Sequence, residues 1–409
     1  MRQARQTVRT MLTAVAVTIA LLVVASIASA APSRVVAATC ARPVGPNAVR
    51  CTALVKDLVR RQSVVTPSGY GPAQLRAAYG VSALASIAPS ATQTVAIVDA
   101  FGDPHLAGDI AAYRTHYGLP TCTAANGCLR IVGQTGSSAL PAGNAGWGLE
   151  TSLDAEMVSA ICPRCHISVV EANGATYGDL GAAENEAVAL GASVVTNSWG
   201  GTDTRLDGSY DSKYFTHPGV AIVASTGDSG YAAGPIYPST SPNVIAVGGT
   251  TLTADAGLAR GFHETAWSNG GSGCSTVEPM PVWQTGVAKA VAACGSKRAV
   301  ADVAAVADPS TGVAVYDSYG YPGWFPGMIG GTSVAAPIVA AMYGLAGHGA
   351  GAGQLGPAVL YAHASYSAPT LFDVTSGANG TCSTVIACTA GIGWDGPTGL
   401  GSPAGIAGF

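Results

Sequence analysis

Charged side chains are scarce in this chain of 409 residues. Only 10% of the residues are charged, and lysine occurs only at Lys56, Lys213, Lys289 and Lys297. With a formal net charge of −4, the composition excludes the basic surface expected for binding to nucleic acid or an anionic membrane. Repeats and low-complexity linkers are also missing. The 48% of hydrophobic residues and 54 glycines therefore indicate a closely packed protein.

Long apolar runs are missing too, except at the N-terminus. Arg2, Arg5 and Arg9 precede an uncharged apolar run at residues 11–27, and the small residues Ala28-Ser29-Ala30 follow. This order is typical of a secretion signal that is cleaved after export. An uncleaved anchor is the alternative, because the run almost spans a bilayer. We expect a signal peptide at residues 1–30, a short segment of unclear purpose at 31–69, and one domain at 70–409. The mature protein is expected to be extracellular and monomeric, with no membrane partner.

Ten cysteines in an exported chain predict disulfides. By proximity the expected pairs are Cys40/Cys51, Cys122/Cys128, Cys162/Cys165, Cys274/Cys294 and Cys382/Cys388. Connectivity does not follow from sequence, and Cys162-Pro163-Arg164-Cys165 has a redox pair as its alternative, although no thioredoxin-like context surrounds it.

Short β-branched runs alternate with helical ones from about Tyr70 onward. Continuous apolar strands separated by helices predict a parallel sheet covered by helices on both faces. The expected strands lie at 94–99, 166–171, 193–198, 219–225 and 243–247, and the expected helices at 105–117, 147–161 and 177–190. Active sites of such sheets lie at the carboxyl ends of the strands. The segments ending at Asp99, Ser198 and Asp228 therefore point toward one edge.

Gly331-Thr332-Ser333 opens an alanine-rich helical run that extends to about residue 345. A hydroxyl at this place meets the unpaired N–H groups and partial positive charge of the helix N-terminus. Such a helix end stabilises an anion that develops on a substrate carbonyl. Ser333 is therefore a candidate nucleophile, although serine and threonine also cap helices for structural reasons.

A serine nucleophile needs a base, and the seven histidines do not stand in the His-Gly-Thr-His pattern of subtilases or in the trypsin-like pattern. Asp99 resembles the aspartate of the subtilase turn, but it has no matching histidine to orient. Glu150 and Asp154 are four residues apart, so a helix places both on one face. A solvated acidic face is the alternative interpretation. Two such carboxylates can share a proton, and Glu150 could then accept the Ser333 proton.

Several ordered motifs resemble the sedolisin family of serine-carboxyl peptidases over about residues 70–403. They are Glu150 with Asp154, Gly227-Asp228-Ser229-Gly230, the segments 237–250 and 307–312, Gly331-Thr332-Ser333, and the segments 373–377 and 393–401. The resemblance implies a subtilisin-like three-layer α/β fold with a mostly parallel sheet. It implies Ser333 as nucleophile, Glu150 as base, Asp154 as its partner and Asp228 as oxyanion donor. Peptides or unfolded proteins would be the substrates.

An aspartate donates a hydrogen bond only when protonated, so the role of Asp228 predicts activity that fades toward neutral pH. The alternative is that Asp228 is simply a turn residue. The resemblance also implies one structural Ca²⁺ in a C-terminal loop, held by carboxylates and backbone carbonyls. Its expected ligands are Asp373, Val374, Gly391, Gly393 and Asp395. An aspartate in a glycine-rich turn without a metal is the alternative.

The chain departs from the sedolisin pattern in two places. Only about 40 residues separate Ala30 from the start of the resemblance, whereas sedolisins usually carry a long folded prosegment. The nucleophile motif reads Gly-Gly-Thr-Ser where Ser-Gly-Thr-Ser is usual. A catalytically inactive secreted binding protein on the same fold and a histidine-dependent subtilase are the competing hypotheses.

Overall fold

The computed structural model describes residues 36–41, 45, 47–56, 66–86, 93–347, 349, 353–365 and 369–409. They fall within one unit of the chain, Val35–Phe409. The expected signal peptide at residues 1–30 lies outside the described residues. Among the residues that are described, no helix has both the length and the apolar character needed to cross a membrane.

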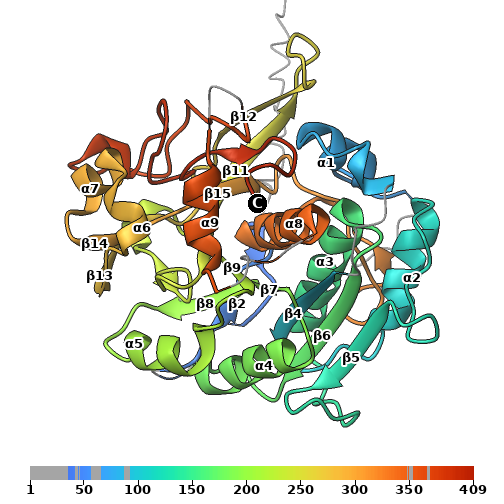
Figure 1. Ribbon diagram of the computed structural model, residues 1–409. Coiled ribbons are helices and arrows are strands. Elements are labelled where there is room, and N and C mark those ends of the chain that lie inside the picture. Colours follow the sequence, from blue (N-terminus) through green and yellow to red (C-terminus); the bar gives the residue numbers. More distant parts are fainter. Residues whose placement is uncertain are drawn as a thin grey trace, which may run out of the picture. The chain divides into compact units, whose positions relative to one another are not determined.

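A mostly parallel sheet of eight strands lies at the centre of the fold (Figure 1). Its order is β12-β11-β9-β7-β4-β6-β5, and β15 also pairs with β11. The pairing of β12 with β11 is antiparallel and the others are parallel. The strands are β4 (Thr94–Ala100), β5 (Leu129–Gly133), β6 (His166–Ala172), β7 (Val194–Asn197), β9 (Ala221–Ser225), β11 (Ile245–Ala254), β12 (Phe262–Ala266) and β15 (Val303–Val306).

Helices cover both faces of this sheet, as Figure 1 shows for α3 and α8 on one side and α4 on the other. Alternate residues of β4 explain the two layers, because successive side chains of a strand point to opposite faces. Val95 and Ile97 pack into the apolar cluster of α3 and α8, whereas Ala96 and Val98 pack into that of α4. The predicted three-layer α/β fold is confirmed. The longer helices are α1 (Pro72–Ala78), α2 (Leu106–His116), α3 (Ala145–Ile161), α4 (Tyr177–Ala189), α8 (Thr332–Ala346) and α9 (Gly356–His363).

Two small sheets join the N-terminal segment to the rest of the fold. One has the order β1-β3-β18 and the other β10-β8-β2. Their strands are β1 (Val36–Ala38), β2 (Arg50–Cys51), β3 (Leu54–Lys56), β8 (Trp199–Thr202), β10 (Ile236–Tyr237) and β18 (Ile329–Gly330). The remaining elements are β13 (Gly273–Pro279), β14 (Lys297–Val300), β16 (Tyr316–Asp317), β17 (Gly323–Trp324), β19 (Leu371–Phe372), β20 (Ser402–Pro403), α5 (Asp207–Tyr210), α6 (Val282–Thr285) and α7 (Ala288–Cys294).

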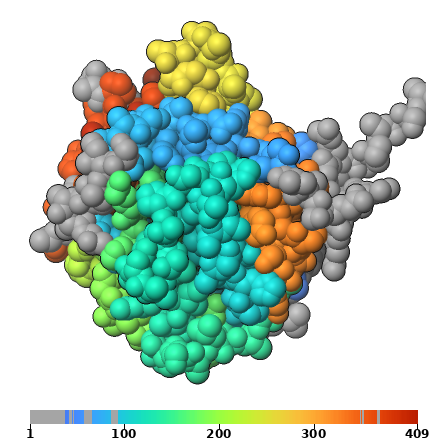
Figure 2. Space-filling view, turned by 90° about the vertical axis from the view of Figure 1, so that its right-hand side faces the viewer, coloured from blue at the N-terminus to red at the C-terminus, as the bar shows by residue number. Residues whose placement is uncertain are grey.

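The hairpin of β11 and β12 projects from the surface and appears in yellow beside the blue surface of α1 in Figure 2. Tyr70 packs edge to face against Phe262, the first residue of β12, with the ring centroids 5.9 Å apart. All five disulfides predicted by proximity are present, so the prediction is confirmed.

Candidate active site

The candidate nucleophile and its candidate base come from two helices that pack against each other. Asn144 caps α3 by accepting hydrogen bonds from two backbone N–H groups, and α3 then carries Glu150 and Asp154 one turn apart. Ser333 lies in the first turn of α8. Glu150, Asp154 and Ser333 all have an exposed fraction of 0%. The Ser333 hydroxyl lies close enough to the Glu150 carboxyl to lower its pKa. The structure therefore brings these three side chains together.

Glu150 and Asp154 belong to a buried group of carboxyls that also contains Asp99 from β4. Burial raises the pKa of Glu150 well above its ordinary value, and the negative charge of Asp99 raises it further. The pKa of Asp154 is raised well above its ordinary value by burial, then by Asp99 and Glu150, while a hydrogen bond from Ser198 opposes the shift. Burial also raises the pKa of Asp99 to about 7. Such a group holds protons in common well above the pH at which free carboxyls ionise.

Asp228 approaches the same point from the loop that follows β9. Its Oδ1 accepts hydrogen bonds from the Thr332 backbone N–H at 2.7 Å and from Thr332 Oγ1 at 2.9 Å. The residue is partly exposed, yet its Oδ2 is buried. Burial raises the pKa of Asp228 to about 7, against the opposing effects of the Thr332 hydrogen bonds and the Arg50 charge. A carboxyl fixed through Oδ1 and protonated on Oδ2 can donate a hydrogen bond to an oxyanion.

The turn before Ser333 requires a glycine. Gly331 has a φ of +102°, and a Cβ built on it would lie 2.0 Å from the Thr52 carbonyl oxygen and 2.8 Å from Asp228 Oδ2. Because Gly331 has no side chain, the Thr52 carbonyl group fits beside the Asp228 carboxyl.

Residues of the N-terminal segment lie within this site. Thr52 Oγ1 is 2.8 Å from Ser333 Oγ, and the Ala53 N–H donates to Glu150 Oε2 at 2.9 Å. Ser198, which follows β7, donates to Asp154 Oδ1 at 2.7 Å, and its carbonyl oxygen accepts from the Thr52 N–H at 3.1 Å. No sequence motif marks Thr52 or Ala53 as neighbours of Ser333.

A cavity of about 620 Å³ adjoins the Asp228 side of the site. Arg50 and Thr52 line it together with parts of β8 and of the loop at Gly227 and Asp228. Arg50 Nη2 lies 3.3 Å from Ser229 Oγ at its edge. The hollow thus opens beside Asp228 and Thr52, and Thr52 Oγ1 in turn lies 2.8 Å from Ser333 Oγ.

Six of the seven histidines fall within the described residues. His105 contacts Ser318 and His217 contacts Asn185, at 3.0 and 2.9 Å. Ser333 Oγ instead has Thr52 Oγ1 and the Ser198 carbonyl oxygen as hydrogen-bond partners. Within the described part of the chain, no histidine hydrogen-bonds Ser333, which disfavours the histidine-dependent alternative.

The expected calcium ligands lie on one glycine-rich loop near the C-terminus. Asp373 Oδ2 accepts from the Gly393 N–H and Asp395 Oδ2 from the Gly391 N–H, both at 2.9 Å. Asp395 is fully buried, and burial raises its pKa to about 7. The negative charge of Asp373 raises that pKa further. Carboxylates and backbone carbonyls are hard oxygen donors, and this type of donor fits Ca²⁺. The Lys289 ammonium contacts the Ile392 carbonyl oxygen beside them.

A model of the subtilase family matches residues 134–373. Sedolisin of Pseudomonas sp. (strain 101) is 30% identical over 378 residues, covering 82% of this chain and 60% of that protein. A solved structure of Pseudomonas sedolisin, a serine-carboxyl proteinase complexed with two molecules of pseudo-iodotyrostatin, is similar with a TM-score of 0.68 at 26% identity. That match covers 83% of this chain and 96% of the solved one. The chain belongs to the sedolisin family, within the subtilases.

Another sedolisin-family relative is kumamolisin of Bacillus sp. (strain MN-32), which is 35% identical over 284 residues. The match covers 63% of this chain and 49% of kumamolisin. The chain thus spans about half the length of kumamolisin and 60% of the length of sedolisin. The predicted family is confirmed, whereas the roles of the individual site residues stay predictions.

One residue of this sedolisin-family site was set aside by sequence reasoning. Sequence reasoning assigns Asp99 no role, because the chain has no matching histidine for it to orient. In the structure its partners are carboxyls, since its charge acts on both Glu150 and Asp154. The sequence offers two signals for Asp99, its position at the end of a buried strand and its likeness to the aspartate of the subtilase turn.

Proposed function

We propose that this protein is a secreted, acid-active serine peptidase that hydrolyses peptide bonds in peptides or unfolded proteins. The burial of Ser333 beside Glu150 carries the proposal, because the adjacent residues Thr52 and Ala53 bond to them, with Thr52 Oγ1 at 2.8 Å from Ser333 Oγ and the Ala53 N–H at 2.9 Å from Glu150 Oε2. An uncharged hydroxyl beside a carboxyl is a nucleophile beside a base. Asp154 and Asp228 complete the arrangement from two other sides, and sedolisin is itself named a serine-carboxyl proteinase.

In the proposed reaction, Ser333 Oγ attacks the substrate carbonyl carbon while Glu150 takes the hydroxyl proton. Asp154, the neighbouring carboxyl on α3, keeps the Glu150 carboxyl in the protonation state that it needs for this transfer. The oxyanion that forms is stabilised by the protonated Oδ2 of Asp228 and by the N-terminus of α8. Glu150 then returns the proton to the leaving amine, and a water molecule hydrolyses the acyl-enzyme by the same steps in reverse order.

The pH dependence follows from Asp228. Its pKa of about 7 lies above that of an ordinary aspartate because of burial. As the pH rises through this value, Oδ2 loses its proton and can no longer donate to the oxyanion. Activity should therefore fall as the pH rises through this value, and on the acidic side it should fall where Glu150 gains the proton that a base must lack.

The test is hydrolysis of a denatured protein between about pH 2.5 and 8, comparing the wild type with Ser333→Ala. Activity confined to acid and abolished by the substitution supports the proposal. A rate that peaks near neutral pH contradicts the carboxyl mechanism, and inactivity at every pH favours a binding protein on the same fold.

We also propose that one Ca²⁺ binds at the C-terminal loop through the Asp373 and Asp395 carboxylates and the carbonyls of Val374, Gly391 and Gly393. The hydrogen bonds that hold the Asp373 and Asp395 carboxyls on the same Gly391–Gly393 stretch support this ligand set. The ion would neutralise them and tie the loop to the body of the fold.

Export is the third part of the proposal. All ten cysteines form disulfides, which persist in oxidising compartments outside the cytosol. Removal of residues 1–30 would give a secreted, monomeric chain that begins at Ala31. The mass and the N-terminal sequence of the first secreted species test this step.

A further inference from the structure

Three aspartates from separate parts of the chain converge at one buried point beside α3. Asp103 follows β4, Asp109 lies in the first turn of α2, and Asp317 belongs to β16. One carboxylate oxygen from each lies within 4.8 Å of the other two. The exposed fractions of the three residues are 3%, 2% and 0%, so water screens their charges poorly. We call these three residues the aspartate cluster.

Hydrogen bonds fix the orientation of each carboxylate in the aspartate cluster. Ser152 Oγ, on α3, donates to Asp103 Oδ2 at 3.2 Å. Ser318 donates to both oxygens of Asp109, from its Oγ at 2.6 Å and from its N–H at 2.8 Å. The Asp317 carboxylate accepts from backbone N–H groups of its own turn. Donors that hold carboxylates in place in this way are typical of the groups that surround metal ligands.

Glu156 brings a fourth carboxyl to the aspartate cluster. It lies one helical turn after Ser152, the residue that donates to Asp103, so both side chains stand on one face of α3. Its Oε2 accepts from the Tyr316 N–H at 3.0 Å, directly before Asp317. Its Oε1 has no hydrogen-bond partner within the described part of the chain, and its exposed fraction is 0%. A buried carboxylate oxygen without a donor requires a proton or a cation.

Positive charge is scarce around these four carboxyls. Burial is the largest effect on the pKa of Asp103 and of Asp109 and raises both, while the charge of the exposed His105 opposes the rise. Among the residues that the structure describes, no lysine or arginine forms an ion pair with any of the four carboxyls. A single imidazolium does not balance this negative charge. A bound cation or shared protons must therefore supply the rest.

The spacing and chemistry of the donors fit Ca²⁺. Each bond from Ca²⁺ to an oxygen is about 2.3–2.6 Å long, so ligands on opposite sides of the ion are about 4.6–5.2 Å apart. Three oxygens that lie within 4.8 Å of one another can therefore all reach one ion. Carboxylates are hard donors, and a buried point suits Ca²⁺ better than Mg²⁺, which gives up its water reluctantly.

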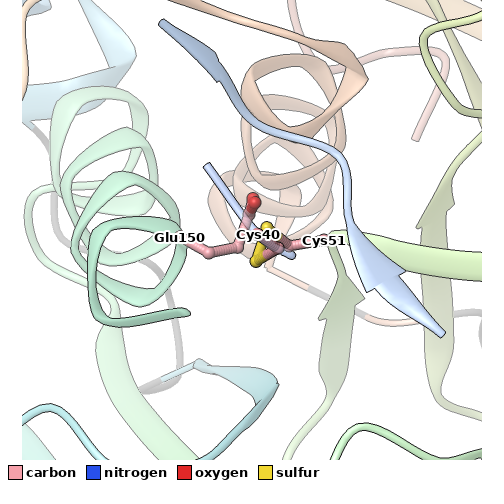
Figure 3. A group of neighbouring side chains, drawn as sticks. All are labelled: Cys40, Cys51 and Glu150. Atoms are coloured by element: carbon pink, nitrogen blue, oxygen red, sulfur yellow. A yellow bond between two sulfur atoms is a disulfide. The ribbon is translucent and has the colours of Figure 1, made fainter. Parts of the chain in front are cut away.

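A second group of possible metal ligands does not have this character. It consists of Cys40, Cys51 and Glu150. Figure 3 shows the two sulfurs joined in a disulfide beside Glu150 of α3. Cysteine binds metals as a thiolate, which a disulfide does not offer. The aspartate cluster is therefore the stronger candidate.

We propose that the aspartate cluster is a Ca²⁺ site in addition to the C-terminal loop, with Glu156 Oε1 as a further ligand. The ion would join the loop after β4 to α2, α3 and β16. Helices α2 and α3 pack side by side, and β16 packs against both (Figure 1). Its role is structural, and its binding does not depend on the proposed peptidase activity.

The ion would also hold the helix that carries the candidate catalytic carboxyls. Residues two apart on a helix point in nearly opposite directions. Ser152 and Glu156 therefore face the aspartate cluster, while Glu150 and Asp154 face the candidate active site from the other side of α3. A Ca²⁺ at the cluster would fix α3 from the side opposite to that site.

The test counts the Ca²⁺ ions that the full chain binds near neutral pH, by isothermal titration calorimetry. Every chain carries Ser333→Ala to prevent self-digestion and Asp373→Asn to remove the proposed C-terminal site. This parent chain should bind one Ca²⁺, and Ca²⁺ should raise its melting temperature. Adding Asp109→Asn should weaken the binding about tenfold or more, because asparagine keeps bonds to Ser318 but lacks the charge. Asp179→Asn, in the first turn of α4, is the matched control and should bind as the parent does.

Glu156→Gln is a second variant that keeps the acceptor for the Tyr316 N–H and loses the charge. It should weaken Ca²⁺ binding about tenfold. In chelator, its melting temperature should equal or exceed that of the parent chain, because a buried carboxyl without a cation has been removed. A purely structural role of Glu156 would instead lower the melting temperature in chelator and leave the affinity for Ca²⁺ unchanged.

Three outcomes overturn the proposal. If the parent chain binds no Ca²⁺ at roughly ten times the millimolar Kd of weak extracellular sites, protons alone neutralise the cluster. Binding that Asp109→Asn leaves unchanged places the ion elsewhere. Equal losses in Asp109→Asn and Asp179→Asn would mean that only the net charge of the protein matters. Since every chain lacks Ser333, failure of the peptidase mechanism would not affect these results.

Discussion

At the scale of single residues, Asp228 tests whether a neutral carboxyl is needed. Asparagine keeps the acceptor for Thr332 and places an N–H₂ donor at Oδ2 that needs no proton. We expect Asp228→Asn to keep activity and to extend it above the pH at which the wild type declines. Asp228→Ala, the paired control, should lose about 10²–10³-fold in kcat. Equal losses in the two variants across the whole pH profile would contradict an oxyanion role.

Asp99 affects the Glu150 carboxyl through its negative charge. After burial, its charge is the largest contribution that raises the pKa of Glu150. Asp99→Asn removes that charge, so Glu150 should lose its proton at lower pH. The acidic limb of the kcat profile should therefore move to lower pH. Asp179→Asn, at the start of α4, is the control. An unchanged limb with a uniformly lower rate would mean that Asp99 supports only the structure.

At the scale of elements, the helices that carry the candidate site could be predicted, because the pattern of neighbouring residues in the sequence specifies them. The helix of Glu150 and Asp154 follows from their spacing, and α8 follows from the glycine turn and the alanine-rich run after Ser333. The strands β2 and β3 could not be predicted, because each is two or three residues long and pairs with a strand far away in sequence. The arrangement of Thr52 and Ala53 depends on those pairings, so the site was incomplete without the structure.

The C-terminal loop gives the prediction for metal removal. If Asp373 and Asp395 bind Ca²⁺, chelation should lower the melting temperature, because a ligand at about 100 times its Kd stabilises the folded state by about 2.7 kcal/mol. Asp373→Asn should lower the melting temperature in calcium and should make it less sensitive to chelator. Asp255→Asn is the control, since Asp255 accepts a similar bond from Gly257 in an exposed hairpin. Equal melting curves with and without chelator in the wild type would rule out the metal.

At the scale of the whole molecule, the sequence predicted the layers well because β-branched runs such as residues 94–98 are buried on both faces. It gave no sign of how many carboxyls those layers would bury. Glu171 and Asp317 have pKa values raised to about 7, and Glu184 to about 8, with burial as the largest cause each time. Among the described residues no lysine or arginine counters these three shifts, so protonation takes the place of an ion pair.

This burial predicts that the fold loses stability as the pH rises. Near pH 4 and below, such carboxyls are protonated in both the folded and the unfolded chain, so they do not change the free energy of unfolding with pH. Between about pH 4 and 8 the unfolded chain ionises first, so the free energy of unfolding falls by about 1.4 kcal/mol per pH unit for each such group. Urea titrations at several pH values measure this slope, and the Ser333→Ala variant is used because it cannot digest itself.

Adding Glu184→Gln should make the slope of the free energy of unfolding against pH shallower, because that buried group no longer titrates. Glu186→Gln, half-buried on the same helix, is the matched control. A stability that is flat from pH 4 to 8 would mean that these carboxyls ionise in the folded state as they do in water.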